Sequence, residues 1–418
     1  MKYPTPIGGT KGRLNISGVG PRFGSTKLAA AITRGALALA ALSALLLMAA
    51  RPAHAQTESV LHSFALNDTD GYYPYAGLAI DTTGNLYGTT YEGGSYNEGT
   101  VFKVSPSGTV TALHSFGGGD GANPYLCRVV RDKAGNLYGV TIQGGANGVG
   151  TVFKLSPTGT ETVLHSFAAD GKDGYRPYAS LAIDTTGNLY GTTTSGGASS
   201  YGTVFKVTPS GTETVLYSFK GGTDGCNPYN SGVVLGKKGV LYGATVACGA
   251  NAVGTVFKLT RTGTETVLHS FANSGTDGFN PYAGLVLDKT TGNFYGTTYY
   301  GGASDAGTVF MVTPTGTETV VHSFATDGKD GYHPYAGLVL DKTGNLYGTT
   351  SAGGVSGLGT AFKITPSGTE TVLHSFANNG TDGYYPYASL VLGKKGILYG
   401  TTYVGGGLGY GTVFKIVP

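Results

Sequence analysis

The sequence predicts an all-β protein, a seven-bladed β-propeller of four-stranded antiparallel blades, closed by pairing of the N-terminal strand with the last blade. Three observations support this prediction. A unit of about 52 residues recurs seven times between residues 56 and 418, each unit contains four short β segments, and the chain ends divide one unit between them. No segment has the 3.6-residue apolar period of an amphipathic helix.

Several short motifs mark each unit. His-Ser-Phe, or once Tyr-Ser-Phe, recurs at intervals of 51 to 53 residues. It begins at His62, His114, His165, Tyr217, His269, His322 and His374. A Pro-Tyr pair has its tyrosines at Tyr75, Tyr125, Tyr178, Tyr229, Tyr282, Tyr335 and Tyr387. Leu-Tyr-Gly (once Phe-Tyr-Gly) and Gly-Thr-x-Phe also occur once per unit. Matching copies of these motifs indicate seven structural repeats.

The third unit illustrates the four β segments. Residues 177–184, 189–194, 202–208 and 213–219 are rich in β-branched and aromatic residues and are bounded by Gly, Asp and Pro. Thr-Thr-Gly-Asn joins the first to the second, and Pro-Ser-Gly-Thr joins the third to the fourth. Both connections have hairpin length and hairpin chemistry.

The two ends of the repeat region decide between a closed ring and an open solenoid. The region opens with a lone fourth strand, residues 58–64, and stops after a lone third strand, residues 411–417. Each strand type occurs seven times only if these two strands pair. That pairing would remove the exposed sheet edge, and a solenoid has no need of it.

The N-terminal 55 residues have the composition of a secretory signal. They contain seven Lys and Arg and no Asp or Glu, followed by an apolar run at residues 35–50. Ala53-His54-Ala55 is a small-x-small site, so cleavage is predicted between Ala55 and Gln56. An uncleaved N-terminal anchor is the alternative. The prediction is a signal peptide over 1–55, a propeller domain over 56–418, and a secreted, periplasmic or cell-surface location without a membrane span after cleavage.

Charge argues against a nucleic-acid partner. Of the 27 basic residues, seven precede residue 56, which leaves 20 against 24 acidic residues in the propeller domain. Its lysines are scattered singly through the repeats, so no basic patch is expected.

The repeated pattern Tyr-Gly-Thr-Thr…Gly-Gly…Gly-Thr-Val-Phe-Lys…Gly-Thr-Glu-Thr-Val-Leu-His-Ser-Phe resembles the GloVer tandem repeat of bacterial secreted proteins, whose members carry varied surface anchors. The resemblance covers residues 58–418. It implies an exported repeat protein folded as a propeller, with no assigned activity. The sequence ends at Pro418, directly after a repeat strand, so a C-terminal anchor is not expected.

The histidines of His-Ser-Phe are predicted to be structural. A residue that recurs in every blade meets the same surroundings each time, whereas a catalytic histidine needs one specific neighbour. We expect a hydrogen-bonded side chain packed between blades, with Tyr217 standing in once.

The Asp-Gly turns before each Pro-Tyr are the predicted ligand site. Their aspartates are Asp70, Asp120, Asp173, Asp224, Asp277, Asp330 and Asp382. Aromatic residues follow closely at Tyr72, Tyr73, Tyr175, Phe279, Tyr332, Tyr384 and Tyr385. Tyrosine faces beside carboxylates and amides suit a sugar ring. The alternative is that these aromatics pack into neighbouring blades.

The same turns are also candidates for calcium binding. Asp68, Asp170 and Asp327 supply a second carboxylate in three of them, as at the start of a calcium loop. None has the later acidic residue that would complete the shell, so no cofactor is predicted.

These residues predict a binding or scaffold module, with a carbohydrate or other surface polymer as the favoured ligand and a monomer as the expected state. The alternatives are a structural or protein-interaction disc that contacts a surface protein, and a polysaccharide lyase or glycosidase. No catalytic residue is predicted, because no nucleophile elbow, phosphate loop or zinc-protease motif is present.

The three cysteines predict one disulfide. Cys226 replaces the aromatic residue of an Asp-Gly-Tyr loop, and Cys248 replaces the first Gly of a Gly-Gly loop. The strand order places both loops at the same end of one blade, so a bond between Cys226 and Cys248 is predicted. Cys127 is expected to be a small core residue.

Overall fold

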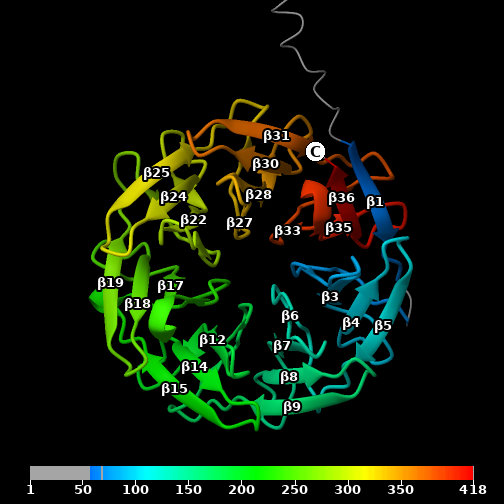
Figure 1. Ribbon diagram of the computed structural model, residues 1–418, viewed down its shortest axis with the longest axis horizontal. Helices are drawn as coiled ribbons and strands as arrows, with labels where there is room; N and C mark the ends of the chain where they lie inside the picture. The colour runs from blue at the N-terminus through cyan, green and yellow to red at the C-terminus, as the bar shows by residue number, and fades with distance from the viewer. Residues whose placement is uncertain (1–56, 67–68, 418) are drawn as a thin grey trace, which may run out of the picture. The chain divides into compact units, whose positions relative to one another are not determined.

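The computed structural model describes residues 57–66 and 69–417. These residues form seven four-stranded antiparallel sheets arranged in a ring (Figure 1). The predicted signal segment and its cleavage site between Ala55 and Gln56 lie outside the described residues. The prediction of a seven-bladed propeller is confirmed. Within residues 57–66 and 69–417, no helix is long and apolar enough to cross a membrane.

The blades are numbered 1 to 7 in chain order, and each has an inner, second, third and outer strand. The inner strands are β2 (Ala79–Ile80), β6 (Val130–Arg131), β11 (Ala182–Ile183), β16 (Val234–Leu235), β21 (Val286–Leu287), β27 (Val339–Leu340) and β33 (Val391–Leu392). The second strands are β3 (Leu86–Thr90), β7 (Leu137–Thr141), β12 (Leu189–Thr193), β17 (Leu241–Thr245), β22 (Phe294–Thr298), β28 (Leu346–Thr350) and β34 (Leu398–Thr402).

The third strands are β4 (Thr100–Val104), β8 (Thr151–Leu155), β14 (Thr203–Val207), β18 (Thr255–Leu259), β24 (Thr308–Val312), β30 (Thr360–Ile364) and β36 (Thr412–Val417). The outer strands are β5 (Val110–Ser115), β9 (Glu161–Ser166), β15 (Glu213–Ser218), β19 (Glu265–Ser270), β25 (Glu318–Ser323), β31 (Glu370–Ser375) and, for blade 7, β1 (Thr57–Ser63).

Short elements lie in the loops between these strands. Two-residue ladders join β10 (Gly174–Tyr175) to β13 (Ser195–Gly196), β20 (Gly278–Phe279) to β23 (Tyr300–Gly301), β26 (Gly331–Tyr332) to β29 (Ala352–Gly353), and β32 (Gly383–Tyr384) to β35 (Val404–Gly405). Single 3-10 turns occur at η1 (Gly222–Asp224), η2 (Lys237–Gly239) and η3 (Lys394–Gly396).

Blade 7 closes the ring as predicted. β1 pairs antiparallel with β36, from Thr57 opposite Val417 to Ser63 opposite Thr412, with a bulge between Val60 and His62. Figure 1 shows the blue first strand lying beside the red last one. The ends of the described chain therefore meet within a single sheet, and β1 covers the edge that β36 would otherwise expose.

The inner segment is shorter than the sequence suggests. Residues 177–184 were expected to form one strand, but only Ala182 and Ile183 pair with a neighbour. Pro177 has no N–H to donate, and Ser180 accepts a 3.0 Å hydrogen bond from the backbone N–H of Arg128 in the preceding blade. The chain near the axis thus bonds between blades instead of extending the sheet.

Phenylalanines fill the junctions between blades. The Phe that ends each His-Ser-Phe motif makes an edge-to-face contact with the Phe of the next blade's third strand, as Phe167 does with Phe205 at 5.1 Å between ring centroids. The junction between blades 7 and 1 repeats this contact through Phe64 and Phe102. All four of these rings are fully buried. Each junction is therefore a small apolar core of its own.

The Tyr-Gly and Val-Phe motifs form one cross-strand unit. Gly191 of β12 lies directly opposite Phe205 of β14. A Cβ atom on Gly191 would lie 2.5 Å from Cζ of Phe205 and 2.8 Å from Cδ2 of Leu181, because the Phe ring covers the glycine. Only glycine leaves room for the ring, which explains why the two motifs recur together.

Candidate functional site

The loops divide the propeller into two faces. Each blade's two hairpin turns lie at one face, because the antiparallel second and third strands carry the chain back and forth. The Asp-Gly loops and the Gly-Gly loops meet at the opposite face, as the pairing of Gly174 with Gly196 shows. We call this opposite face the loop face. The sequence analysis had placed these two sets of loops together.

A closed ring of seven tyrosines surrounds the axis at the loop face. The Pro-Tyr tyrosine of each blade contacts those of the two adjacent blades, with ring centroids 4.6 to 6.0 Å apart. Its members are Tyr75, Tyr125, Tyr178, Tyr229, Tyr282, Tyr335 and Tyr387. Burial raises the pKa of Tyr75, Tyr125 and Tyr335 well above the usual range, so these hydroxyls stay protonated. We call this set the tyrosine ring.

A narrow channel of about 160 Å³ is lined by Gly77, Ser180, Gly232 and Gly284, with Tyr387 of the tyrosine ring also in its wall. Arg128 occupies the corresponding position in blade 2 and is the one charged side chain among the described residues that line the channel. Burial lowers the pKa of its guanidinium group, which nevertheless remains charged. Arg128 therefore breaks the sevenfold repetition at the axis.

Aromatic residues gather unevenly around the tyrosine ring. The two positions after each second strand are Tyr299 and Tyr300 in blade 5, but Ser351 and Ala352 in blade 6. Tyr299 and Tyr300 join Tyr229, Tyr282, Tyr335 and Asn227 around a cleft of about 590 Å³. The amide of Asn227 donates to the carbonyl of Thr194 at 3.0 Å, which fixes its orientation. We call these six residues the aromatic cleft.

The Asp-Gly aspartates lie away from the aromatic cleft, against the outer strands. Six of them pair with the histidine of the preceding His-Ser-Phe motif. The distances from Nε2 to the carboxylate oxygen are 3.6 Å for His62–Asp70, 2.9 Å for His114–Asp120, 2.9 Å for His165–Asp173, 3.4 Å for His269–Asp277, 3.7 Å for His322–Asp330 and 2.9 Å for His374–Asp382. In blade 3, Tyr217 donates to Asp224 at 2.7 Å. The expected hydrogen-bonded histidine is present in three blades, at His114, His165 and His374, and its partner is the aspartate that was predicted to bind a ligand.

The aromatics after each Asp-Gly divide into two groups. Tyr72, Tyr175, Phe279, Tyr332 and Tyr384 pack against the hydrophobic cores at the blade junctions. Tyr175 also covers Gly196, where a Cβ atom would lie 2.9 Å from its ring. Tyr73 and Tyr385 have φ angles of 59° and 57°, and their rings lie 4.9 Å from Tyr403 and 6.3 Å from Tyr387, respectively. Tyr73 also packs against the core that contains Tyr72. Their contact with a ligand stays a prediction.

In blade 4 a disulfide takes the place of the tyrosine and glycine that contact each other in blade 3. Cys226 and Cys248 are bonded, with Cα atoms 5.3 Å apart. Cys226 is opposite Ala247, in the position that Tyr175 has in blade 3, and Cys248 takes the place of Gly196. The sulfur atoms thus fill the space that tyrosine over glycine fills elsewhere. Cys127 is a buried free thiol.

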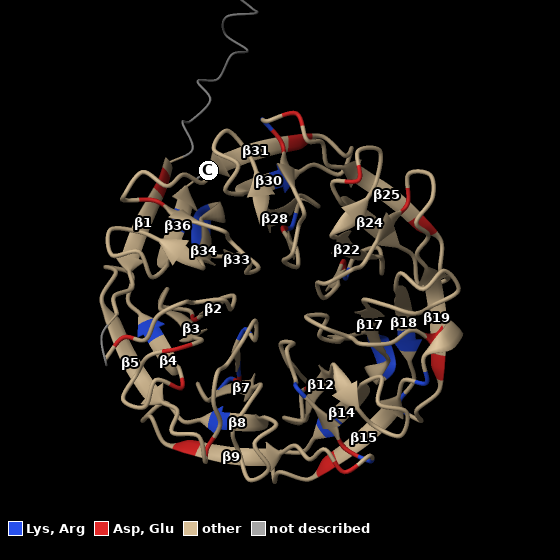
Figure 2. Cartoon of the chain, turned by 180° about the vertical axis from the view of Figure 1, so that it is seen from behind, with Lys and Arg blue, Asp and Glu red and all other residues tan. Residues whose placement is uncertain are grey.

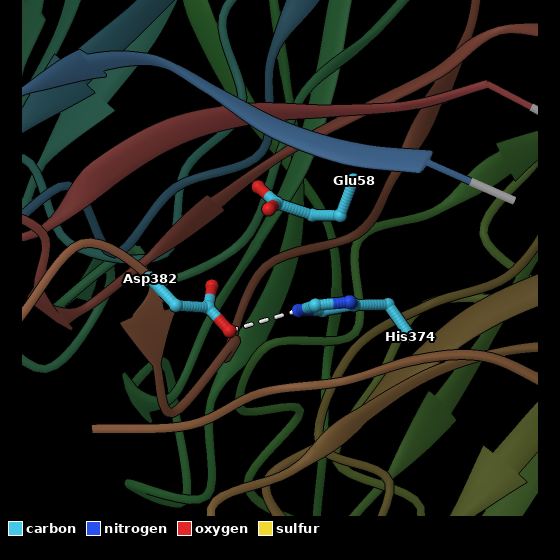
Figure 3. Close-up of side chains that lie close together, drawn as sticks. All are labelled: Glu58, His374 and Asp382. Atoms are coloured by element: carbon cyan, nitrogen blue, oxygen red, sulfur yellow. Dashed lines mark hydrogen bonds and ion pairs between the residues drawn. The ribbon is translucent and has the colours of Figure 1, made fainter. Parts of the chain in front are cut away.

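A glutamate completes the His–Asp pair at several junctions. Six outer strands contribute it near their start, whereas β5 has Val110 there. Figure 3 shows Glu58 of β1 facing His374 and Asp382 of the preceding blade. Burial, with the nearby Asp382 carboxylate, raises the pKa of Glu58 to about 7. Figure 2 shows acidic residues along the outer strands, and the sequence analysis did not foresee that they would meet the histidines.

Glu265 provides a test of how burial and a nearby carboxylate affect the stability of the protein. Burial and the Asp224 carboxylate raise its pKa to about 7, against a lowering contribution from Lys220. Because the folded state holds this proton more tightly than the unfolded chain, Glu265 stabilises less and less as pH rises from about 4.5 to 7. Glu265→Gln should therefore unfold like the parent at pH 5 and be more stable by ~1–2 kcal/mol at pH 8. Urea titrations at both pH values measure this, and a difference independent of pH would contradict it.

Comparison with solved structures finds proteins that share the fold. The extracellular domain of a hybrid two-component system from B. thetaiotaomicron is 12% identical, with a TM-score of 0.56, over 87% of this chain and 41% of that one. That of a one-component system from the same organism is 11% identical, with a TM-score of 0.54, over 87% and 40%. The chain thus spans about two fifths of these structures, and the likeness is one of fold. No curated protein matches the chain.

The family comparison covers almost the whole propeller. The model of the Gloeobacter/Verrucomicrobia repeat matches residues 49–235 and residues 222–414, in two tandem copies. This agrees with the resemblance stated from the repeated motifs. The chain belongs to the Gloeobacter/Verrucomicrobia repeat family.

Proposed function

We propose that the protein is an exported binding module whose loop face holds a carbohydrate chain, with the aromatic cleft as the principal contact. The observation that carries this proposal is a 590 Å³ cleft whose wall is aromatic. Five half-buried tyrosines form that wall: Tyr229, Tyr282, Tyr299, Tyr300 and Tyr335. Flat aromatic rings stack on the apolar faces of sugars, and the amide of Asn227 is placed to bond a hydroxyl.

The distribution of constant and variable positions supports the loop face as the functional one. Residues that build the junctions, such as Phe167 and Phe205, recur in every blade. The two positions after each second strand change from blade to blade, and they produce the clustered aromatics of blade 5. A purely structural disc would not need this asymmetry. The predicted signal segment and the disulfide agree with an oxidising compartment outside the cytoplasm.

A glycan array probed with the chain from Gln56 onward tests the proposal. Binding to a defined set of glycans supports it, release of sugar fragments would instead indicate a lyase or glycosidase, and silence would favour the structural or protein-interaction disc. The array should be probed in parallel with a variant that lacks the cleft aromatics.

The variant Tyr299→Ser/Tyr300→Ala can be made with little structural cost, because Ser351 and Ala352 occupy these positions in blade 6. The loss of two stacking contacts of ~1 kcal/mol each should weaken glycan binding roughly 30-fold. Tyr96→Ala removes an exposed tyrosine from a Gly-Gly loop outside the cleft and should bind like the parent. Equal binding by the parent and the cleft variant would refute the assignment.

A further inference from the structure

The Glu–His–Asp clusters between blades have the composition and convergence of metal sites. In three of them, one ligand atom from each residue lies within 4.8 Å of the other two. The clusters are His165–Asp173–Glu213, His269–Asp277–Glu318 and Glu58–His374–Asp382. They bridge blades 2 and 3, blades 4 and 5, and blades 6 and 7. We propose that these three clusters each bind a divalent transition-metal ion, zinc being the one their ligands fit best, and so connect neighbouring blades.

The cluster between blades 4 and 5 carries the argument furthest. His269 Nε2, Asp277 Oδ1 and Glu318 Oε1 are all buried atoms without a hydrogen-bond partner. Buried polar atoms are almost always paired. His322, Asp330 and Glu370 have the same three unpartnered atoms, but among the described residues only those at the junction of blades 4 and 5 also bring their ligand atoms within 4.8 Å of one another, which points to a shared missing partner. The three groups include two carboxylates, so a cation satisfies them together. Figure 3 shows the equivalent side chains of Glu58, His374 and Asp382 close together, with His374 bonded to Asp382 at 2.9 Å.

The spacing within the cluster suits zinc. Ligand atoms at ~2.0–2.1 Å from a tetrahedral zinc ion lie about 3.3 Å apart. His269 Nε2 and Asp277 Oδ2 are 3.4 Å apart, too far for a strong hydrogen bond but near this tetrahedral edge. The backbone N–H of Ala272 donates to Asp277 Oδ2 at 2.9 Å and holds the carboxylate in place.

The donor set also selects among ions. One imidazole nitrogen with two carboxylate oxygens suits zinc, whereas calcium and magnesium prefer oxygen ligands throughout. The side chains of His269 and Asp277 keep 20% and 18% of their exposure, so water can reach the cluster and fill a fourth position.

The repeats supply internal controls. At the junction of blades 3 and 4, Tyr217 replaces the histidine beside Asp224 and Glu265. At the junction of blades 7 and 1, Val110 of β5 replaces the glutamate. Neither junction offers the three ligand types, yet both keep the same packing of Phe between blades. The Glu–His–Asp combination is therefore not required for blades to pack.

The test uses the chain from Gln56 onward, stripped with a chelator and dialysed. Zinc titration by calorimetry, with elemental analysis of the loaded protein, should give three zinc ions per chain and a higher unfolding temperature. Calcium and magnesium at the same concentrations should give neither. The absence of zinc binding, or equal binding of calcium, would overturn the proposal.

Isosteric variants assign the sites. Glu318→Gln should reduce the stoichiometry from three to two, whereas the control Glu265→Gln, at the same strand position beside Tyr217, should leave it at three. His269→Tyr reproduces the natural Tyr217 arrangement and should also give two, which tests the site even if Glu318→Gln fails to fold. Three zinc ions in either ligand variant would show that the metal binds elsewhere and refute the assignment.

Discussion

Deletion of residues 56–66 is expected to destabilise the protein and to make it aggregate. The deletion removes β1, the outer strand of blade 7, together with Phe64, whose fully buried ring contacts Phe102 of blade 1. Loss of such a ring alone costs ~3–5 kcal/mol, and the lost ladder bonds add ~1 kcal/mol each. The exposed edge of β36 then becomes a template for a second chain. Thermal unfolding and light scattering measure both effects.

A rearranged chain distinguishes the effect of losing the strand β1 from the effect of losing ring closure by the N-terminal strand. Moving residues 58–66 to follow Pro418 through a Ser-Gly-Thr linker copies the third-to-outer connection of blade 3. This chain should recover most of the lost stability, because the outer strand is supplied by an ordinary hairpin. If the plain deletion stays monomeric and unfolds at the parental temperature, closure through β1 is not what holds the ring.

Removal of the disulfide has the second-largest expected effect. Cys226→Ser/Cys248→Ser opens a loop with a sequence separation of 22 residues, for which the chain-entropy model gives ~3 kcal/mol of lost stability. The variant also leaves blade 4 without any large group between its two loops. Urea unfolding under non-reducing conditions measures the loss. Thiol counting on the denatured, unreduced parent should find one free thiol, that of Cys127, and three would refute the bond.

The neighbouring blades suggest a compensating variant. Cys226→Tyr/Cys248→Gly recreates the tyrosine-over-glycine pair that Tyr175 and Gly196 form in blade 3. It should be more stable than the double-serine variant, since the ring refills the space, but it lacks the covalent constraint. Equal stability of the two variants would mean that packing at this position contributes nothing.

Much of the fold could be predicted because its markers recur along the chain. The motif spacing gave seven blades, and the lone strands at 58–64 and 411–417 gave the closure. The inner strands were overestimated, since pattern alone does not show that Ser180 bonds with the preceding blade instead of its own sheet. Local propensity describes a segment, whereas convergence toward an axis is a property of the assembled ring.

The candidate site was harder to predict, because its residues come from different blades. The aspartates and the histidines were each noticed, yet nothing in a linear pattern says that His165 faces Asp173 and that Glu213 of the next blade joins them. The Pro-Tyr tyrosines touch those of the neighbouring blades and so form a ring around the axis. Their near-constant interval of 50 to 53 residues was the signal for that ring.

The pairing of β1 with β36 also determines the order in which the molecule can be completed. β1 is the first strand of the propeller to leave the ribosome, and its partner is the last, with Thr57 finally opposite Val417. Blades 1 to 6 consist of local hairpins and can form as they are synthesised, whereas blade 7 must wait for the whole chain. Ring closure is thus a late step, and it costs the conformational entropy of closing a loop that spans the whole propeller. Until it occurs, β1 and the last blade both present unpaired edges. For the export proposed above, this order means that the chain would cross the membrane unfolded and close only after its final strand has arrived.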